Sequence, residues 1–260
     1  MSSPLPPELL DLVVDDLHDQ RAALLACGLV SKSWILRARR HIFAHVVLGK
    51  LTIDSWMKAF PDPSDSPAHH TKYLAIISAQ LVTAAGTDVG RWIRAFHNIV
   101  HLHVDTHNLR LDERLDDDGQ VSFVPLHGIS PTVKSLHLCS TSPRDSEVFG
   151  FLCSFPLLED FTLDAFRPRI GAEEWETPLA SPSLTGSLNL GGVDSGVGPI
   201  ARRLLDLPGG LNFTKIVSAG ACGDDFKATA DLVSRCSGTT ESLTISDCLL
   251  SGFPSTAALD

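Results

Sequence analysis

Residues 5–42 read LPPELLDLVVDDLHDQRAALLACGLVSKSWILRARRHI, a pattern that predicts three short helices. Two prolines precede the first helix, where proline is tolerated because the first N–H groups of a helix have no helical partner. The second helix, from Ala22 to Val30, is apolar almost all round, so it must be covered on every side. Its two short neighbours cannot cover it fully, and about 45 residues lie near the lower limit for an independent core. The segment therefore predicts a partner protein.

The same segment resembles an F-box. The resemblance is carried by Leu5-Pro6-x-Glu8-Leu9-Leu10, by the spaced leucines that follow, and by Leu29-Val30-Ser31-Lys32-Ser33-Trp34. The phrasing is similar to F-box proteins abundant in mushroom-forming fungi, although many members have cysteine or arginine at the position of Ser31. This resemblance implies that residues 1–45 bind a Skp-type adaptor, and through it a cullin, as part of a ubiquitin ligase.

Eight positions match residues that contact the adaptor or pack the helices in that family. They are Leu5, Pro6, Leu9, Leu10, Val13, Leu29, Val30 and Trp34. For each of them, packing within a small apolar core is an equal alternative to direct adaptor contact, since an apolar stripe on a helix usually faces a core.

Beyond residue 45, an apolar-x-apolar triplet recurs eight times and predicts eight short strands. The intervals between first members are 28, 28, 34, 25, 27, 28 and 27 residues, and those members are Val46, Leu74, Leu102, Leu136, Phe161, Leu188, Ile216 and Leu243. Helical patterns occupy residues 89–96, 146–155, 199–207 and 226–236. This period resembles a degenerate leucine-rich repeat.

The predicted fold class is therefore α+β or α/β. It comprises a three-helix F-box over residues 1–45 and a degenerate leucine-rich-repeat-like solenoid of parallel strands with outer helices over residues 46–260. A compact α/β domain with the same alternation of strands and helices is the alternative.

In a parallel array, the apolar residues of each triplet enter the core and the residues around them share the opposite face. The sequence thus predicts a mixed polar and acidic target-binding face made of His101, His103, Asp105, His137, Asp160, Thr162, Asp164 and Asn189. A second explanation needs no ligand, because any exposed sheet face must be polar.

Charge and composition narrow the classes of partner. The formal net charge is −10, and residues 1–45 contain five acidic and five basic residues, so the remaining chain carries all of it. Such a domain repels phosphate backbones, which argues against nucleic acid. No run of about 18 apolar residues predicts a membrane span. The first residues lack a signal peptide, and six cysteines without a CxxC pair fit reduced thiols, so we expect the cytoplasm, with access to the nucleus.

Motifs for chemistry are not found. Residues 192–196 have the wrong spacing for a nucleophile elbow. In the acidic run near Gly119, an EF-hand alignment would require Arg114 and Pro125 as calcium ligands, which neither residue can be. We therefore expect a non-catalytic subunit with no cofactor. Two alternatives to a ligase subunit are a non-ligase F-box scaffold and a plain repeat-type interaction domain whose N-terminal helices only cap the array.

Histidines on neighbouring predicted strands raise the question of zinc. His101 and His103 share a face of one strand, His137 lies on the next, and Asp105 is close in sequence. Zinc binding depends on a strand register that the sequence does not give, and histidines on exposed strands usually have no metal. The expectation is therefore that no metal is bound.

Overall fold

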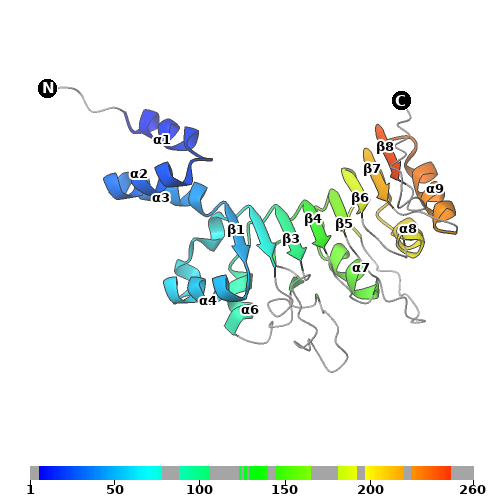
Figure 1. Cartoon of the computed structure of the whole chain (residues 1–260), viewed down its shortest axis with the longest axis horizontal. Coiled ribbons are helices and arrows are strands. Elements are labelled where there is room, and N and C mark those ends of the chain that lie inside the picture. Colours follow the sequence, from blue (N-terminus) through cyan, green and yellow to red (C-terminus); the bar gives the residue numbers. More distant parts are fainter. Residues whose placement is uncertain are drawn as a thin grey trace, which may run out of the picture.

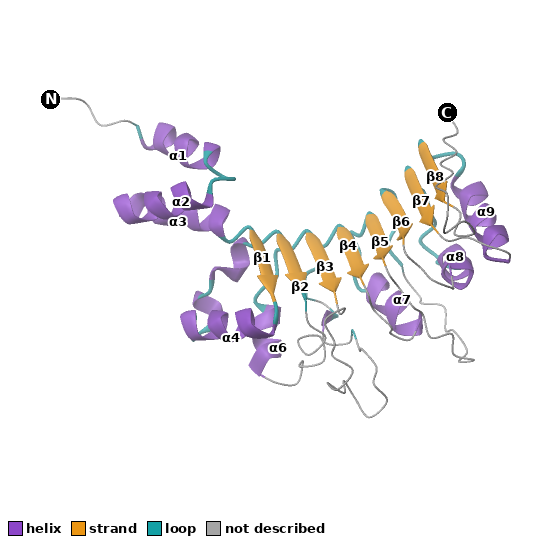
Figure 2. Ribbon diagram, in the orientation of Figure 1, coloured by secondary structure: helices purple, strands orange, loops and turns teal. Residues whose placement is uncertain are grey.

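The structure, a computed structural model, describes residues 6–77, 88–105, 123, 126–127, 129–139, 145–164, 181–191, 197–219 and 224–246. Three helices at the N-terminal end lead into a curved row of parallel strands with helices on one side (Figures 1 and 2). None of the described helices combines the length and apolar character that crossing a membrane requires.

The three predicted N-terminal helices are present as α1 (Pro7–Asp16), α2 (Arg21–Val30) and α3 (Lys32–Ile42). They enclose a small core, which we call the helical core, of four buried residues: Val14, Leu24, Ala38 and Ile42. Leu17, Trp34 and Phe43 pack against it while remaining partly exposed. So small a core gives these helices little apolar burial of their own.

The eight predicted strands are also present, and they form one parallel sheet in sequence order. Their bounds are β1 His45–Leu48, β2 Tyr73–Ile76, β3 His101–Asp105, β4 Ser135–Cys139, β5 Asp160–Asp164, β6 Ser187–Gly191, β7 Lys215–Ala219 and β8 Ser242–Ser246. The register aligns the first apolar residues of all eight triplets in one row, from Val46 to Leu243. Equal spacing in sequence has thus become equal register in space.

Helices cover the outer, convex side of this sheet (Figure 2). They are α4 (Lys50–Ala59), α6 (Asp88–Arg94), α7 (Asp145–Cys153), α8 (Val197–Leu205) and α9 (Asp224–Cys236), with 3₁₀ turns η1 (Pro63–Asp65) and η2 (Pro67–His70) between α4 and β2. Apolar residues of strands and helices form one continuous cluster, the array core. Its aromatic centre includes Phe151, stacked on Phe123 at 4.9 Å between ring centroids and edge-on to Phe155.

Helix α4 was not among the predicted helices. Its apolar residues recur at helical spacing: Ile53 is buried, and Trp56, Met57 and Phe60 pack against the array core. Phe43, at the end of α3, contacts the rings of Trp56 and Phe60 edge-on. It also packs against the helical core, so it links the two apolar clusters.

Candidate functional site

Exposed apolar side chains gather on the N-terminal helices. Among the described residues, seven of the eleven exposed large apolar side chains lie on α1, α2 and α3. We call this set the apolar helix surface: Leu9, Leu12, Val13, Leu25, Leu29, Val30 and Leu36. Leu29 is 90% exposed and Val30 is 73% exposed, values that burial in the helical core would not leave. A concentration of this kind marks a surface for contact with another protein.

The predicted adaptor-binding residues divide into three groups in the structure. Leu9, Val13, Leu29 and Val30 belong to the apolar helix surface, and Pro6 beside them in sequence is also exposed. Leu10 is partly buried. Trp34 packs against the helical core. Leu5 lies outside the described residues.

Sequence matching passed over three residues of the apolar helix surface: Leu12, Leu25 and Leu36. The helical period could have indicated Leu25, which precedes Leu29 by four residues and therefore lies on the same face of α2. Which side of an almost wholly apolar helix is covered is decided by its neighbours, so the sequence of α2 alone does not reveal it.

A carboxylate fastens α1 to α3 beneath this surface. The guanidinium of Arg37 donates to both carboxylate oxygens of Asp15, and Nε lies 2.6 Å from Oδ1. Nε2 of His41 lies 2.7 Å from the same Oδ1. Hydrogen bonds from Arg37 first, and then from His41, hold the pKa of Asp15 well below its usual range. The ion pair fixes the angle at which α1 presents Leu9 and Val13.

The second surface is the concave side of the sheet, and all eight residues predicted for it lie there. Strand register arranges its centre in three rows. The first row is His101, Ser135, Asp160 and Ser187; the second is His103, His137, Thr162 and Asn189; the third is Asp105, Cys139, Asp164 and Gly191. Each member alternates along its strand with buried residues and is itself partly or fully exposed. We call these three rows the polar face.

One member of the polar face also has a role within the sheet. Oδ1 of Asp160 accepts hydrogen bonds from the backbone N–H of Ser187 at 2.6 Å and from its hydroxyl at 2.7 Å. At Gly186, an added Cβ would collide with the same carboxylate, so glycine is needed there. Asp160 therefore ties β5 to β6 whether or not it also contacts a target.

The middle of the polar face brings two histidines together. Nδ1 of His103 lies 3.0 Å from Nδ1 of His137, and the rings are edge-on at 4.4 Å. Burial lowers the pKa of both imidazoles, and for His137 the charge of His103 adds to this effect. Since one ring donates and the other accepts, this pair is stable only when it is not doubly protonated. His101, which the sequence placed with them, stands in the neighbouring row.

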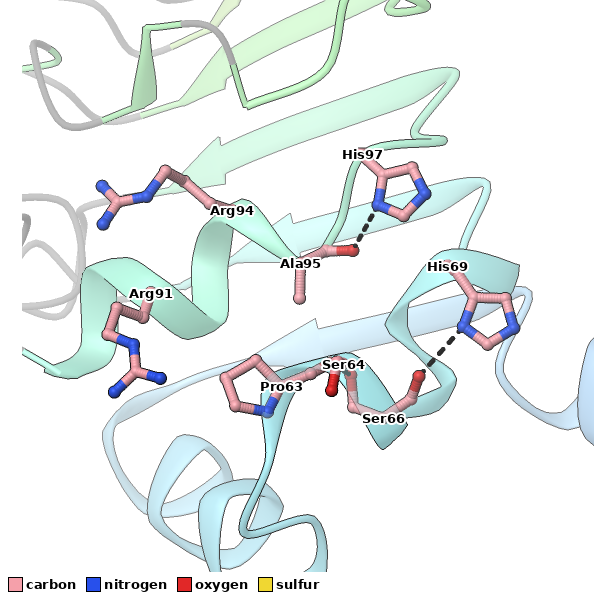
Figure 3. A pocket seen from close by; sticks show the side chains of 8 residues that line it. All are labelled: Pro63, Ser64, Ser66, His69, Arg91, Arg94, Ala95 and His97. Atoms are coloured by element: carbon pink, nitrogen blue, oxygen red, sulfur yellow. Dashed lines mark hydrogen bonds between the residues drawn. The ribbon is translucent and has the colours of Figure 1, made fainter.

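A small basic pocket of 280 Å³ lies away from both surfaces (Figure 3). Arg91 and Arg94 of α6 form one side of it, and Ser64 and Ser66, in and after η1, form the other. Its lining contrasts with the acidic character of the chain. No feature of the sequence had pointed to it, because its two sides are almost 30 residues apart.

Comparison of the chain with protein-family models, with curated proteins and with solved structures finds no match. Function must therefore be argued from the apolar helix surface and the polar face.

Proposed function

We propose that the chain is the substrate-recognition subunit of a Skp–cullin–F-box ubiquitin ligase acting in the cytoplasm or nucleus. In this proposal α1–α3 are an F-box that binds a Skp-type adaptor, and the strand array is a degenerate leucine-rich-repeat solenoid that binds a target protein. The chain itself makes no bonds. It raises the local concentration of the target near the ubiquitin-loaded enzyme.

The observation that carries the proposal is the apolar helix surface. Burying an apolar side chain is worth about 1.5–3 kcal/mol, so a 36-residue segment that leaves seven of them exposed gives up much of its stabilisation unless a partner covers them. The exposed set includes Leu9 and Leu29, which also match the F-box pattern. Exposure and pattern support the same interface from independent directions.

The shape of the array supports target binding. Eight parallel strands in sequence order, at nearly constant spacing and with helices only on the outer side, are typical of a repeat solenoid. Such arrays bind proteins along their concave side, which here is the polar face. Its histidines, carboxylates, amide and hydroxyls suit hydrogen bonding to a protein surface.

A binding measurement with a purified fungal Skp-type adaptor tests the F-box. Leu29→Asp and Val30→Asp should each weaken binding by about 2 kcal/mol or more, which is roughly 30-fold, because each places a charge in an apolar interface. The matched control is Leu51→Asp, since Leu51 is 81% exposed but lies on α4. This control should bind like the unmodified chain.

Two results would contradict the proposal in different ways. Failure of the unmodified chain to bind the adaptor would reject the F-box and favour a plain interaction domain. Equal binding by folded Leu29→Asp and Val30→Asp variants would reject the apolar helix surface as the interface. Trp34 is a poorer test position, because a charge there would also damage the helical core.

The non-ligase scaffold remains the second candidate, and it shares adaptor binding with the first. Affinity purification of the intact chain, followed by identification of its partners, should recover the adaptor and a target together. Ubiquitination of that target by the reconstituted complex supports the ligase. A bound target that is never modified supports the scaffold.

A further inference from the structure

Three side chains of metal-ligand type meet on the polar face where β4 and β5 run together. His137 and Cys139 are two residues apart on β4 and share its concave side, and Asp164 is paired in register with Cys139 on β5. One potential ligand atom from each of them lies within 4.8 Å of the other two. The sequence gave no hint of this set, because Asp164 is separated from Cys139 by α7 and its loops.

His137 provides a second observation. One ring nitrogen, Nδ1, is hydrogen-bonded to His103 at 3.0 Å. The other, Nε2, is buried and has no hydrogen-bond partner among the described residues. A buried polar atom without a partner costs about 1–3 kcal/mol, so its persistence calls for a group that uses the Nε2 lone pair.

We propose that His137, Cys139 and Asp164 bind a zinc ion on the concave side of the sheet. Imidazole, thiolate and carboxylate together suit zinc, whereas calcium and magnesium require several oxygen ligands and here find a single carboxylate among the three. Ligand atoms around tetrahedral zinc are about 3.4–3.8 Å apart, given bond lengths near 2.0–2.3 Å. Side-chain rotations of about 1 Å therefore close the site.

The remaining parts of a zinc site have counterparts here. The fourth tetrahedral position is left for water, as in sites with three protein ligands. His103 takes the outer role: it accepts the Nδ1–H of His137 and so holds that ring in the tautomer with Nε2 available to the metal. This differs from the expectation of no metal and from the histidine set considered in the sequence, since His101 lies in another row and Cys139 takes part.

Titration of the full-length, reduced, chelator-treated chain with zinc chloride tests the site by calorimetry. One zinc per chain is expected, with affinity reduced at least tenfold in His137→Ala, Cys139→Ser and Asp164→Asn. His103→Ala should cost about 10- to 100-fold, the usual effect of losing an outer hydrogen bond. His101→Ala is the control on the same face, and Cys27→Ser is the control for thiols elsewhere; neither should change affinity. Cobalt substitution should give a thiolate charge-transfer absorption that Cys139→Ser removes.

The proposal fails if the unmodified chain binds no zinc, or if zinc binds equally well to Asp164→Asn and Cys139→Ser. Asp164 is exposed, so its substitution should leave the fold intact even if the variant at Cys139 does not fold. Circular dichroism of the metal-free variants verifies this. The site does not depend on adaptor binding, and the two proposals can fail separately.

Discussion

The N-terminal helices and the strand array use apolar residues in opposite ways. In the array, buried positions recur on every strand from β1 to β7, and neighbouring strands and outer helices cover them. In α1–α3, four apolar residues are buried and seven large ones remain exposed. The first arrangement produces a fold, and the second produces a surface. Apolar content alone does not distinguish them; coverage by neighbours does.

Phe161→Ala should have the largest effect, because it strikes the array at its centre. Phe161 is fully buried and is paired in register with Leu136 and Leu188. Loss of its ring should lower the free energy of unfolding by about 3–5 kcal/mol, measured by denaturant titration. Thr162→Ala, one residue further along on the polar face, should change it by less than about 0.5 kcal/mol. Similar losses for both variants would mean that the two faces of β5 are not distinct.

Leu24→Ala should act more locally. Leu24 is buried in the helical core, and its truncation should cost about 2–5 kcal/mol of local stability. Hydrogen exchange should then lose protection within residues 7–42 and keep it in β4, β5 and β6. Loss of protection in those strands as well would show that Phe43 couples the two cores into one cooperative unit.

Much of this architecture could be predicted from period alone. The triplets beginning at Val46 and Leu243 mark the first and last strands, and the helices after Asp88 and Asp224 follow the expected stretches. Helix α4 escaped because Ile53 and Trp56 stand between polar residues and proline-rich sequence, so their helical spacing is short and weak. Local pattern reveals an element when that pattern is long enough to repeat.

The candidate sites were less predictable, and the reason is register. His103 and His137 could be placed on neighbouring strands, but their contact requires that the 34-residue interval between them leave the strands in step. Cys139 was overlooked since a thiol next to a strand end has no distinctive pattern. Its partner Asp164 is brought to it by the pairing of β4 with β5.

Ser218→Ala should stabilise the array. Ser218 is fully buried in the row that contains Leu190 and Ile245, and its hydroxyl has no hydrogen-bond partner among the described residues. Removing that hydroxyl should raise the free energy of unfolding by about 1 kcal/mol. Ser130→Ala is the matched control, since the equally buried Ser130 hydroxyl lies 2.8 Å from the carbonyl oxygen of His97, and its loss should destabilise. A destabilised Ser218→Ala variant would contradict the assignment.

The ion pair beneath the apolar helix surface should make the helices sensitive to acid. Because the pKa of Asp15 is lowered in the folded chain, its stabilising contribution is present above pH 4 or so, near the ordinary value of about 3.9. It is lost as the pH falls below that value, since the unfolded chain then takes up the proton first. Thermal unfolding should therefore separate the unmodified chain from Asp15→Asn at pH 7, and the gap should narrow by pH 3. A gap of constant size would refute this linkage. The effect should be modest, because the carboxylate is partly exposed and salt screens it.

Leu29→Ser should have the smallest effect on stability and makes the comparison sharpest. Leu29 lies five residues from Leu24 on the same helix, yet Leu29 is 90% exposed and Leu24 is 1% exposed. The substitution should change the free energy of unfolding by less than about 0.5 kcal/mol, measured by the same denaturant titration as Leu24→Ala. Binding of a dye that fluoresces on apolar surfaces should fall at the same time. A large loss of stability would mean that Leu29 belongs to the core. If stability is unchanged, the fold does not need this leucine, and its apolar character must serve a contact that the chain makes with another protein.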